Sequence, residues 1–319
     1  MQVRVRSITR EAPGIHTYEL VDPAGAELVP FTAGSHIDVH LPGGFVRQYS
    51  LCNDPGDRHR YVVGVLDVAG GRGGSKAMHR DVRVGDVLII SAPRNNFPLA
   101  AHASRHILIA GGIGVTPMIA MVEALSAQGA DFTVLYCTRS PDLTAFRDRL
   151  APHDAAGRVS FHHDEGDRSR GLDFVAVLRE HRPGTHAYCC GPAGLMNAVK
   201  AATSHWPDGS VHFEFFAAPP EPVAQNDGCA IGVGTFQVRL ASSGAVYAVP
   251  PGKSIVDVLR DNGIACETSC EAGVCGTCRT RYLEGVPEHN DFLLNDAEHE
   301  EFVLICCARS RSDLLVLDR

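Results

Sequence analysis

The sequence contains 319 residues and carries a formal net charge of −8, with 45% hydrophobic and 21% charged residues. Because a domain usually holds roughly 100 to 200 residues, this length predicts two or three domains. The composition is typical of globular proteins and excludes a chain that is disordered throughout. The acidic balance makes nucleic acid a poor partner.

The sequence does not predict a membrane span or a secretory signal. The longest uncharged stretch, between Arg105 and Glu123, has only 17 residues and includes glycine and proline. Residues 1–6 alternate apolar and charged side chains and lack the apolar core of a signal peptide. Eleven cysteines, four of them between positions 266 and 278, favour metal or redox chemistry over a disulfide framework. We therefore expect a cytoplasmic protein with no membrane partner.

Residues 1–102 have the pattern of a small antiparallel domain. Short runs rich in Val, Ile and Tyr alternate with Gly/Pro turns, which is typical of a barrel or sandwich. The clearest runs are 36–41, 48–52, 61–67 and 87–91.

Residues 103–218 change to alternating strand-like and helix-like segments. The expected strands are 107–110, 132–137, 159–163, 187–190 and 211–216, and the expected helices are 117–127, 141–150 and 174–180. This alternation predicts a parallel α/β sheet with crossover helices.

Residues 219–232 contain proline, small and polar residues without a hydrophobic period, so they are expected to form an interdomain linker. A third domain is predicted over 233–319. Segments 235–240 and 245–249 resemble a hairpin, and 254–261 a helix with Ser254 as N-cap.

The most specific motif is a group of cysteines in the third domain. Cys270, Cys275 and Cys278 have the C-x4-C-x2-C spacing of plant-type [2Fe-2S] proteins, and a further cysteine follows after 27 intervening residues. Glycines between them permit the sharp turns that bring three thiolates together. A zinc site or buried structural cysteines are the alternatives. The fourth ligand is either Cys306 or Cys307, because neighbouring strand residues point to opposite faces.

A second motif lies in the first domain. Arg47, Tyr49 and Ser50 occupy a predicted strand, and a glycine-rich segment, 70–75, follows downstream with Arg72 inside it. A cation beside a glycine-rich turn can bind a flavin phosphate, and Tyr49 can pack on the flavin. The alternative is an ordinary strand followed by a flexible loop.

A third motif lies where predicted strands of the second domain end. Gly111, Gly112 and Gly114 separate a strand from a helix, where they would let the backbone approach a pyrophosphate. The segment Cys190-Gly191-Pro192 follows another strand of the same sheet. A tight strand-to-helix turn and a chemically inert buried thiol are the alternatives.

These three motifs, in this order, resemble the phthalate dioxygenase reductase family, the reductase components of Rieske-type oxygenases, which includes vanillate demethylase reductases. The resemblance covers essentially the whole chain. It implies a multidomain fold, with an antiparallel β-barrel flavin domain, an α/β parallel-sheet nicotinamide domain and a C-terminal α+β plant-type ferredoxin (β-grasp) domain. It also implies FMN, not FAD, together with a [2Fe-2S] cluster and NADH.

The resemblance assigns residues to each cofactor. The FMN set is Arg47, Tyr49, Ser50, Gly64, Val65, Gly73, Gly74, Ser75, Thr116 and Phe216, to which the glycine-rich motif adds Arg72. The nicotinamide set is Thr116 and Cys190, with Thr138, Arg139 and Phe146 on the adenosine side. The strand-end motifs add Gly111, Gly112, Gly114, Gly191 and Pro192 to the nicotinamide set. Thr116 and Cys190 are the catalytic candidates, Cys190 placing the nicotinamide and not acting as a nucleophile. The family pattern selects Cys306 as fourth cluster ligand.

Hydride transfer from NADH moves two electrons, whereas a [2Fe-2S] cluster accepts one. A chain that uses both therefore needs a carrier that can exchange either one or two electrons, and flavin can do so. The resemblance therefore implies electron flow from NADH through FMN and the cluster to a partner oxygenase acting on an aromatic or similar small substrate. A stand-alone NADH-dependent flavin, ferric or quinone reductase is the alternative enzyme, and a catalytically idle electron-carrier or scaffold protein the other class. No sequence feature indicates the oligomeric state, and we expect a monomer.

Overall fold

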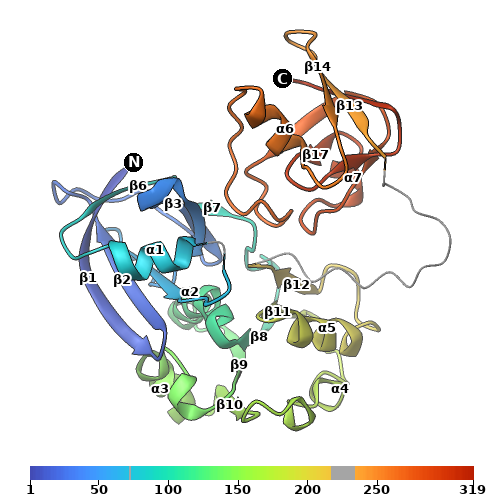
Figure 1. Ribbon diagram of the computed structural model, residues 1–319. Helices are drawn as coiled ribbons and strands as arrows, with labels where there is room; N and C mark the ends of the chain where they lie inside the picture. Colours follow the sequence, from blue (N-terminus) through green and yellow to red (C-terminus); the bar gives the residue numbers. More distant parts are fainter. Residues whose placement is uncertain (72, 217–233) are drawn as a thin grey trace. The chain divides into compact units, whose positions relative to one another are not determined.

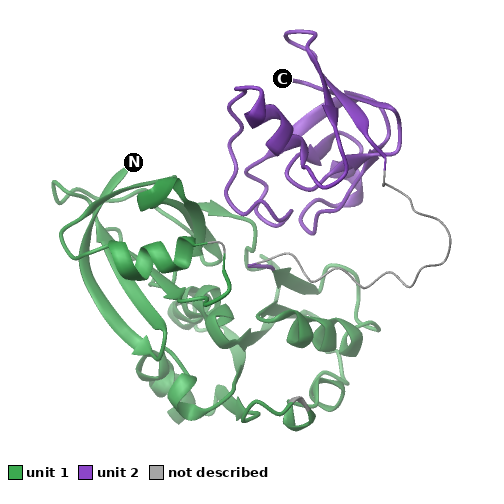
Figure 2. Ribbon diagram, in the orientation of Figure 1, with its two compact units in different colours: residues 1–214 green, residues 215–319 purple. Residues whose placement is uncertain are grey.

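The computed structural model describes residues 1–71, 73–216 and 234–319 (Figure 1). The chain divides into two compact units, residues 1–214 and 215–319 (Figure 2). Arg72, one of the predicted flavin ligands, and the predicted linker 219–232 lie outside the described residues. The three domain boundaries expected from the sequence stay a prediction.

An antiparallel sheet forms the first part of unit 1. Its strands run in the order β4-β3-β6-β1-β2-β5, with β7 paired to β3. An isolated antiparallel bridge between Leu51 and Val63 joins the two ends of this order, so the sheet closes as the predicted barrel. The strands are β1 (Gln2–Ala12), β2 (Ile15–Val21), β3 (Ser35–His40), β4 (Val46–Ser50), β5 (Tyr61–Leu66), β6 (Val87–Ile90) and β7 (Arg94–Asn95), with helix α1 (Gly74–Asp81).

Alternation of side chains explains the interior of this barrel. In β1, Val3 and Val5 are buried while their neighbours are exposed, as a period of two requires. In β3, Ile37 and Val39 point into the same core. Each such side chain contributes about 1.5–3 kcal/mol by leaving water, so the register is strongly fixed.

A parallel sheet forms the rest of unit 1, in the order β10-β9-β8-β11-β12. Its strands are β8 (Arg105–Gly111), β9 (Asp131–Thr138), β10 (Val159–His163), β11 (Thr185–Cys190) and β12 (Val211–Glu214), and its helices α2 (Val115–Ala127), α3 (Arg147–Ala155), α4 (Phe174–Val177) and α5 (Ala193–Ala202). The α/β architecture is as predicted, although β12 ends two residues earlier than expected. Helix α2 is apolar on nearly all sides and is correspondingly buried.

Unit 2 has the β-grasp arrangement expected for a ferredoxin domain. Its main sheet has the order β14-β13-β19-β15-β17, with β13 antiparallel to β14 and parallel to β19. Ser254 caps helix α6 as predicted, accepting a hydrogen bond of 3.0 Å from the Asp257 amide. The elements are β13 (Phe236–Leu240), β14 (Val246–Val249), α6 (Ile255–Asp261), β15 (Arg279–Glu284), β16 (Pro287–Glu288), α7 (Asp296–His299), β17 (Phe302–Leu304), β18 (Arg309–Ser310) and β19 (Leu314–Leu317).

Across the described ranges of both units, no helix combines the length and apolar character needed to cross a bilayer.

Candidate functional site

The four predicted cluster ligands are buried in unit 2. Three lie on the loop between α6 and β15, and the fourth follows β17. Their residues are 3–8% exposed: Cys270, Cys275, Cys278 and Cys306. Every cysteine in the described part of the chain is a free thiol. The loop therefore concentrates unoxidised sulfur donors away from solvent.

The shape of this loop depends on glycine at two positions. Gly273 and Gly276 have φ values of +70° and +73°, in the left-handed region. A Cβ atom on Gly273 would lie 2.8 Å from the Cys307 Sγ and 3.0 Å from the Asp291 Cα. Both glycines are thus required by backbone conformation, and Gly273 also by the close approach of a neighbouring segment.

Hydrogen bonds among the thiols lower the pKa of two of them, Cys275 and Cys306, toward the ionised form that binds iron, and raise the pKa of the other two, Cys270 and Cys278. The amide of Ala272 donates to the Cys270 Sγ at 3.4 Å. The hydrogen bond from Cys270 lowers the pKa of Cys275 to about 6. Hydrogen bonds from Cys270 and Cys278 hold the pKa of Cys306 well below its usual range. Four buried thiols, two of them with thiolate character, fit a [2Fe-2S] cluster, which the four sulfurs would hold.

Cys307 has a different environment from its neighbour. Its thiol donates to the Leu304 carbonyl at 3.5 Å, and contact with Cys306 raises its pKa. It is also less buried than Cys306. These observations support Cys306 as the fourth ligand, which stays a prediction.

The two predicted nucleotide loops of unit 1 lie against each other, backbone to backbone. A Cβ on Gly114 would lie 2.2 Å from the Cys190 carbonyl oxygen, and one on Gly111 would lie 2.6 Å from the Pro192 Cδ. A Cβ on Gly191 would lie 3.0 Å from the Gly111 Cα. Because β8 and β11 are parallel neighbours, their carboxyl ends bring these loops together. Gly112, with φ +53°, has open space around it.

Cys190 and Thr116 lie at the centre of this arrangement. Cys190 is 1% exposed and pairs in register with Ala110 on one side and Glu214 on the other. Burial raises the pKa of the Cys190 thiol well above its usual range, which keeps it neutral and supports a positioning role. The Thr116 hydroxyl donates to the Ile113 carbonyl at 3.0 Å.

Gly64 connects the barrel to this region. A Cβ at Gly64 would lie 2.7 Å from the Thr116 Cγ2 and 3.1 Å from the Phe146 Cζ. Three predicted cofactor residues from distant parts of the sequence are therefore in contact. Phe146, however, is 1% exposed within the core, which favours a packing role over the predicted adenosine contact. Val65 points into the barrel core.

Other residues predicted for the nucleotide lie at the carboxyl end of β9. The Thr138 hydroxyl is engaged internally with the Thr144 hydroxyl, at 2.7 Å, and with the His163 Nδ1, at 2.9 Å. Arg139 is exposed. Of these two, Arg139 is the side chain that is open to a ligand, and its role stays a prediction.

The predicted flavin residues meet where β4 faces helix α1. A Cβ on Gly74 would lie 2.4 Å from the Arg47 Cγ, so the arginine crosses the start of the helix. Gly73, with φ +85°, caps that helix. Ser75 accepts a hydrogen bond from the Val68 amide at 3.2 Å. This combination of a guanidinium and a glycine-rich helix start suits a phosphate.

Tyr49 provides a further test of fit for a flavin. Its hydroxyl is buried and has no hydrogen-bond partner among the described residues. An orphaned buried hydroxyl is costly and indicates a partner that is supplied from outside the chain. Ser50, the next residue along β4, instead donates to the Glu214 Oε2 at 3.5 Å.

Glu214 is a residue that sequence reasoning missed. It ends β12 beside Cys190 and receives the hydrogen bond from Ser50, so three chain segments meet there. Loss of hydration raises the pKa of its carboxyl from 4.5 to about 8. The sequence offered one clue to Glu214, since it is the single acid between the aromatic residues of segment 213–216. The prediction instead selected Phe216, which is 46% exposed and belongs to unit 2.

Family models match both the predicted nicotinamide domain and the predicted iron-sulfur domain. Residues 108–201 match the oxidoreductase NAD-binding domain, and residues 238–311 match the 2Fe-2S iron-sulfur cluster binding domain. The second match includes all four predicted cluster cysteines.

Relatives that match over the full length show which family the chain belongs to. A phthalate 4,5-dioxygenase reductase subunit of Pseudomonas putida is 45% identical over 99% of this chain and 96% of its own length. The solved structure of phthalate dioxygenase reductase, described as modular for electron transfer from pyridine nucleotides to [2Fe-2S], is 42% identical with a TM-score of 0.76, covering 100% and 98% of the two chains. The chain belongs to the phthalate dioxygenase reductase family.

Membership confirms the predicted oxidoreductase class, the three-part fold and the cofactor set of FMN, [2Fe-2S] and NADH. The family is broad in the reactions it serves. The reductase subunit of a tert-butanol monooxygenase / tert-amyl alcohol desaturase from Aquincola tertiaricarbonis is 47% identical over 100% of this chain and 96% of its own length. The individual site residues stay predictions, and the geometry above gives no support to Phe146 or Phe216.

Proposed function

We propose that this chain takes electrons from NADH and delivers them one at a time to a separate Rieske-type oxygenase or O-demethylase. The observation that carries the proposal is the meeting of the two glycine loops, Cys190, Glu214 and Ser50 in unit 1, together with four buried thiols in unit 2. Relatives that serve oxygenases over the full length of the chain support the partner class.

FMN, when bound, supplies the conversion from two-electron to one-electron transfer. The residues of this chain bind and orient the reactants. Arg47 and the start of α1 would hold the flavin phosphate, and the backbone of Gly111 to Gly114 would bind the nucleotide. Cys190, neutral and buried, limits the position of the nicotinamide and excludes water.

Ser50 and Glu214 can hold a proton beside the reacting groups. Because the pKa of Glu214 is raised to about 8, its carboxyl is mainly protonated at pH 7. The Ser50 hydroxyl lies 3.5 Å from it and links it to the flavin-binding strand. This pair would store or release the proton that accompanies reduction.

Reconstitution with a partner tests the proposal. The purified holoprotein should oxidise NADH and reduce an added Rieske oxygenase under anaerobic conditions. Fast reduction of small acceptors with no transfer to any Rieske oxygenase would instead favour the stand-alone reductase.

The finer assignments belong to the same proposal. We place the protein in the cytoplasm as a monomer, and NADH as the preferred donor. The exposed Arg139 is the residue to examine for NADPH use. Relatives are reductase subunits of phthalate and of tert-butanol oxygenase systems. We therefore infer that the partner oxygenase determines the substrate, which is aromatic in some systems and not in others.

A further inference from the structure

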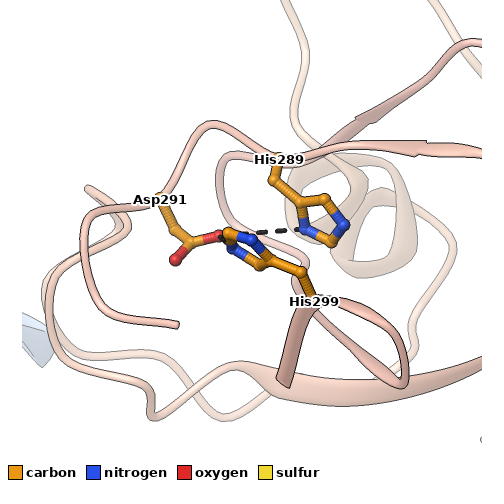
Figure 3. Close-up of side chains that lie close together, drawn as sticks. All are labelled: His289, Asp291 and His299. Atoms are coloured by element: carbon orange, nitrogen blue, oxygen red, sulfur yellow. Dashed lines mark hydrogen bonds and ion pairs between the residues drawn. The ribbon is translucent and has the colours of Figure 1, made fainter. Parts of the chain in front are cut away.

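Unit 2 contains a cluster of side chains that electron transfer does not use. His289, Asp291 and His299 each offer one donor atom, and these atoms all lie within 4.8 Å of one another (Figure 3). His289 and Asp291 come from the segment after β16, and His299 ends helix α7. We propose that these three residues bind one Zn²⁺ ion.

The distances suit a small tetrahedral ion. Ligand atoms about 2.0–2.1 Å from such an ion lie about 3.3 Å from each other. The His299 Nε2 is 3.1 Å from the Asp291 Oδ2, and the His289 Nδ1 is 3.9 Å from the same oxygen. A small rotation of the His289 ring would therefore complete three sides of a tetrahedron and leave the fourth to water.

The carboxylate is already oriented for this role. The Asp291 side chain is 1% exposed, and its Oδ1 accepts hydrogen bonds from the amides of Leu293 and Leu294 at 3.1 and 2.8 Å. These two donors fix the carboxyl group and leave Oδ2 directed at the histidines. Such support of a ligand by backbone donors is typical of metal sites.

The histidines offer a second indication. The His289 Nδ1 is buried and has no hydrogen-bond partner among the described residues. The two imidazole rings stack with centroids 3.9 Å apart, so both rings lie at the same place beside Asp291. Two imidazoles and one carboxylate form a donor set that suits Zn²⁺. Residues 227–319 carry 14 acids and 8 bases, so the surrounding charge also favours a cation.

The site is connected to the cluster loop. The Phe292 amide, next to Asp291, donates to the Gly273 carbonyl at 2.9 Å. Zinc would therefore stiffen the segment that supports the turn between Cys270 and Cys275. We expect bound zinc to slow the loss of iron from the cluster in the presence of a chelator that does not remove the zinc.

The test uses untagged holoprotein with its flavin and cluster in place, incubated with zinc sulfate and then desalted. Elemental analysis should give about one zinc per chain with unchanged iron. His299→Gln and His289→Gln should weaken zinc binding about 10- to 100-fold. His102→Gln, at an exposed histidine of unit 1, should bind zinc like the parent.

X-ray absorption spectroscopy of the zinc-loaded parent protein identifies the atoms bound to zinc. Because it uses no variant, its result does not depend on whether the glutamine variants fold. A first shell of nitrogen and oxygen at about 2.0–2.1 Å supports the proposal, whereas sulfur at about 2.3 Å places the metal on cysteines and overturns it. The proposal also fails if the parent retains no zinc, or if both glutamine variants keep their iron and bind zinc with undiminished affinity.

Discussion

Replacing Glu214 with glutamine should stabilise unit 1, and should do so in a pH-dependent way. The pKa of the carboxyl is raised from 4.5 to about 8, so between these values the folded chain holds a proton that the unfolded chain has released. Stability is therefore lost as pH rises through this window, at about 1.4 kcal/mol per pH unit. Glutamine keeps an acceptor for Ser50 and carries no such loss.

The raised pKa of the Glu214 carboxyl lowers the free energy of unfolding by under about 1 kcal/mol at pH 5 and by about 3 kcal/mol at pH 7. Because the residue as a whole is only partly buried, we expect Glu214→Gln to raise the free energy of unfolding by about 2–3 kcal/mol at pH 7. Trp206, the single tryptophan, is buried in the same unit, so its fluorescence in urea reports on this unit.

Glu27→Gln, at a side chain that is 58% exposed, is the matched control and should change the free energy by less than about 1 kcal/mol at either pH. The reasoning is refuted if Glu214→Gln gives the same change at pH 5 and pH 7, or if it destabilises the unit at pH 7.

Five further substitutions test the sites. Cys190→Ala should slow hydride transfer about tenfold or more while flavin stays bound, because the nicotinamide loses a contact that orients it; stopped-flow reduction measures this, and an unchanged rate contradicts it. Cys275→Ser should abolish the cluster signals while NADH still bleaches the flavin, whereas Cys307→Ser should keep the cluster; the reverse result would change the ligand set. Gly114→Ala should lower stability by about 2 kcal/mol or more, because its Cβ would lie 2.2 Å from a carbonyl oxygen, while Gly194→Ala, with open space, should be tolerated; equal melting temperatures would contradict the contact.

The sequence predicted best those features whose evidence lies close together along the chain. The three cysteines between 270 and 278 share one loop, so spacing alone predicted a cluster site. The alternation of strands and helices likewise predicted the parallel sheet, because crossover connections leave few topologies. The resemblance added Gly64, Val65, Thr116 and Phe216 to the flavin residues and selected Cys306 as the fourth cluster ligand.

What the sequence could not predict depends on contacts between distant segments. Glu214 becomes unusual only because β12 lies beside β11 and Ser50 reaches it from the barrel. The burial of Phe146 against Gly64 similarly depends on how the barrel packs on the parallel sheet. His299 shows no local relation to Asp291 until helix α7 turns it back.

The contact between the glycine loops has a consequence for cofactor engineering. A Cβ at Gly191 would lie 3.0 Å from the Gly111 Cα and one at Gly114 would lie 2.2 Å from the Cys190 carbonyl oxygen, so these glycine positions of the predicted nucleotide site have no room for a larger residue. Attempts to change the choice of dinucleotide should therefore keep these glycines and alter Arg139, an exposed residue on the predicted adenosine side.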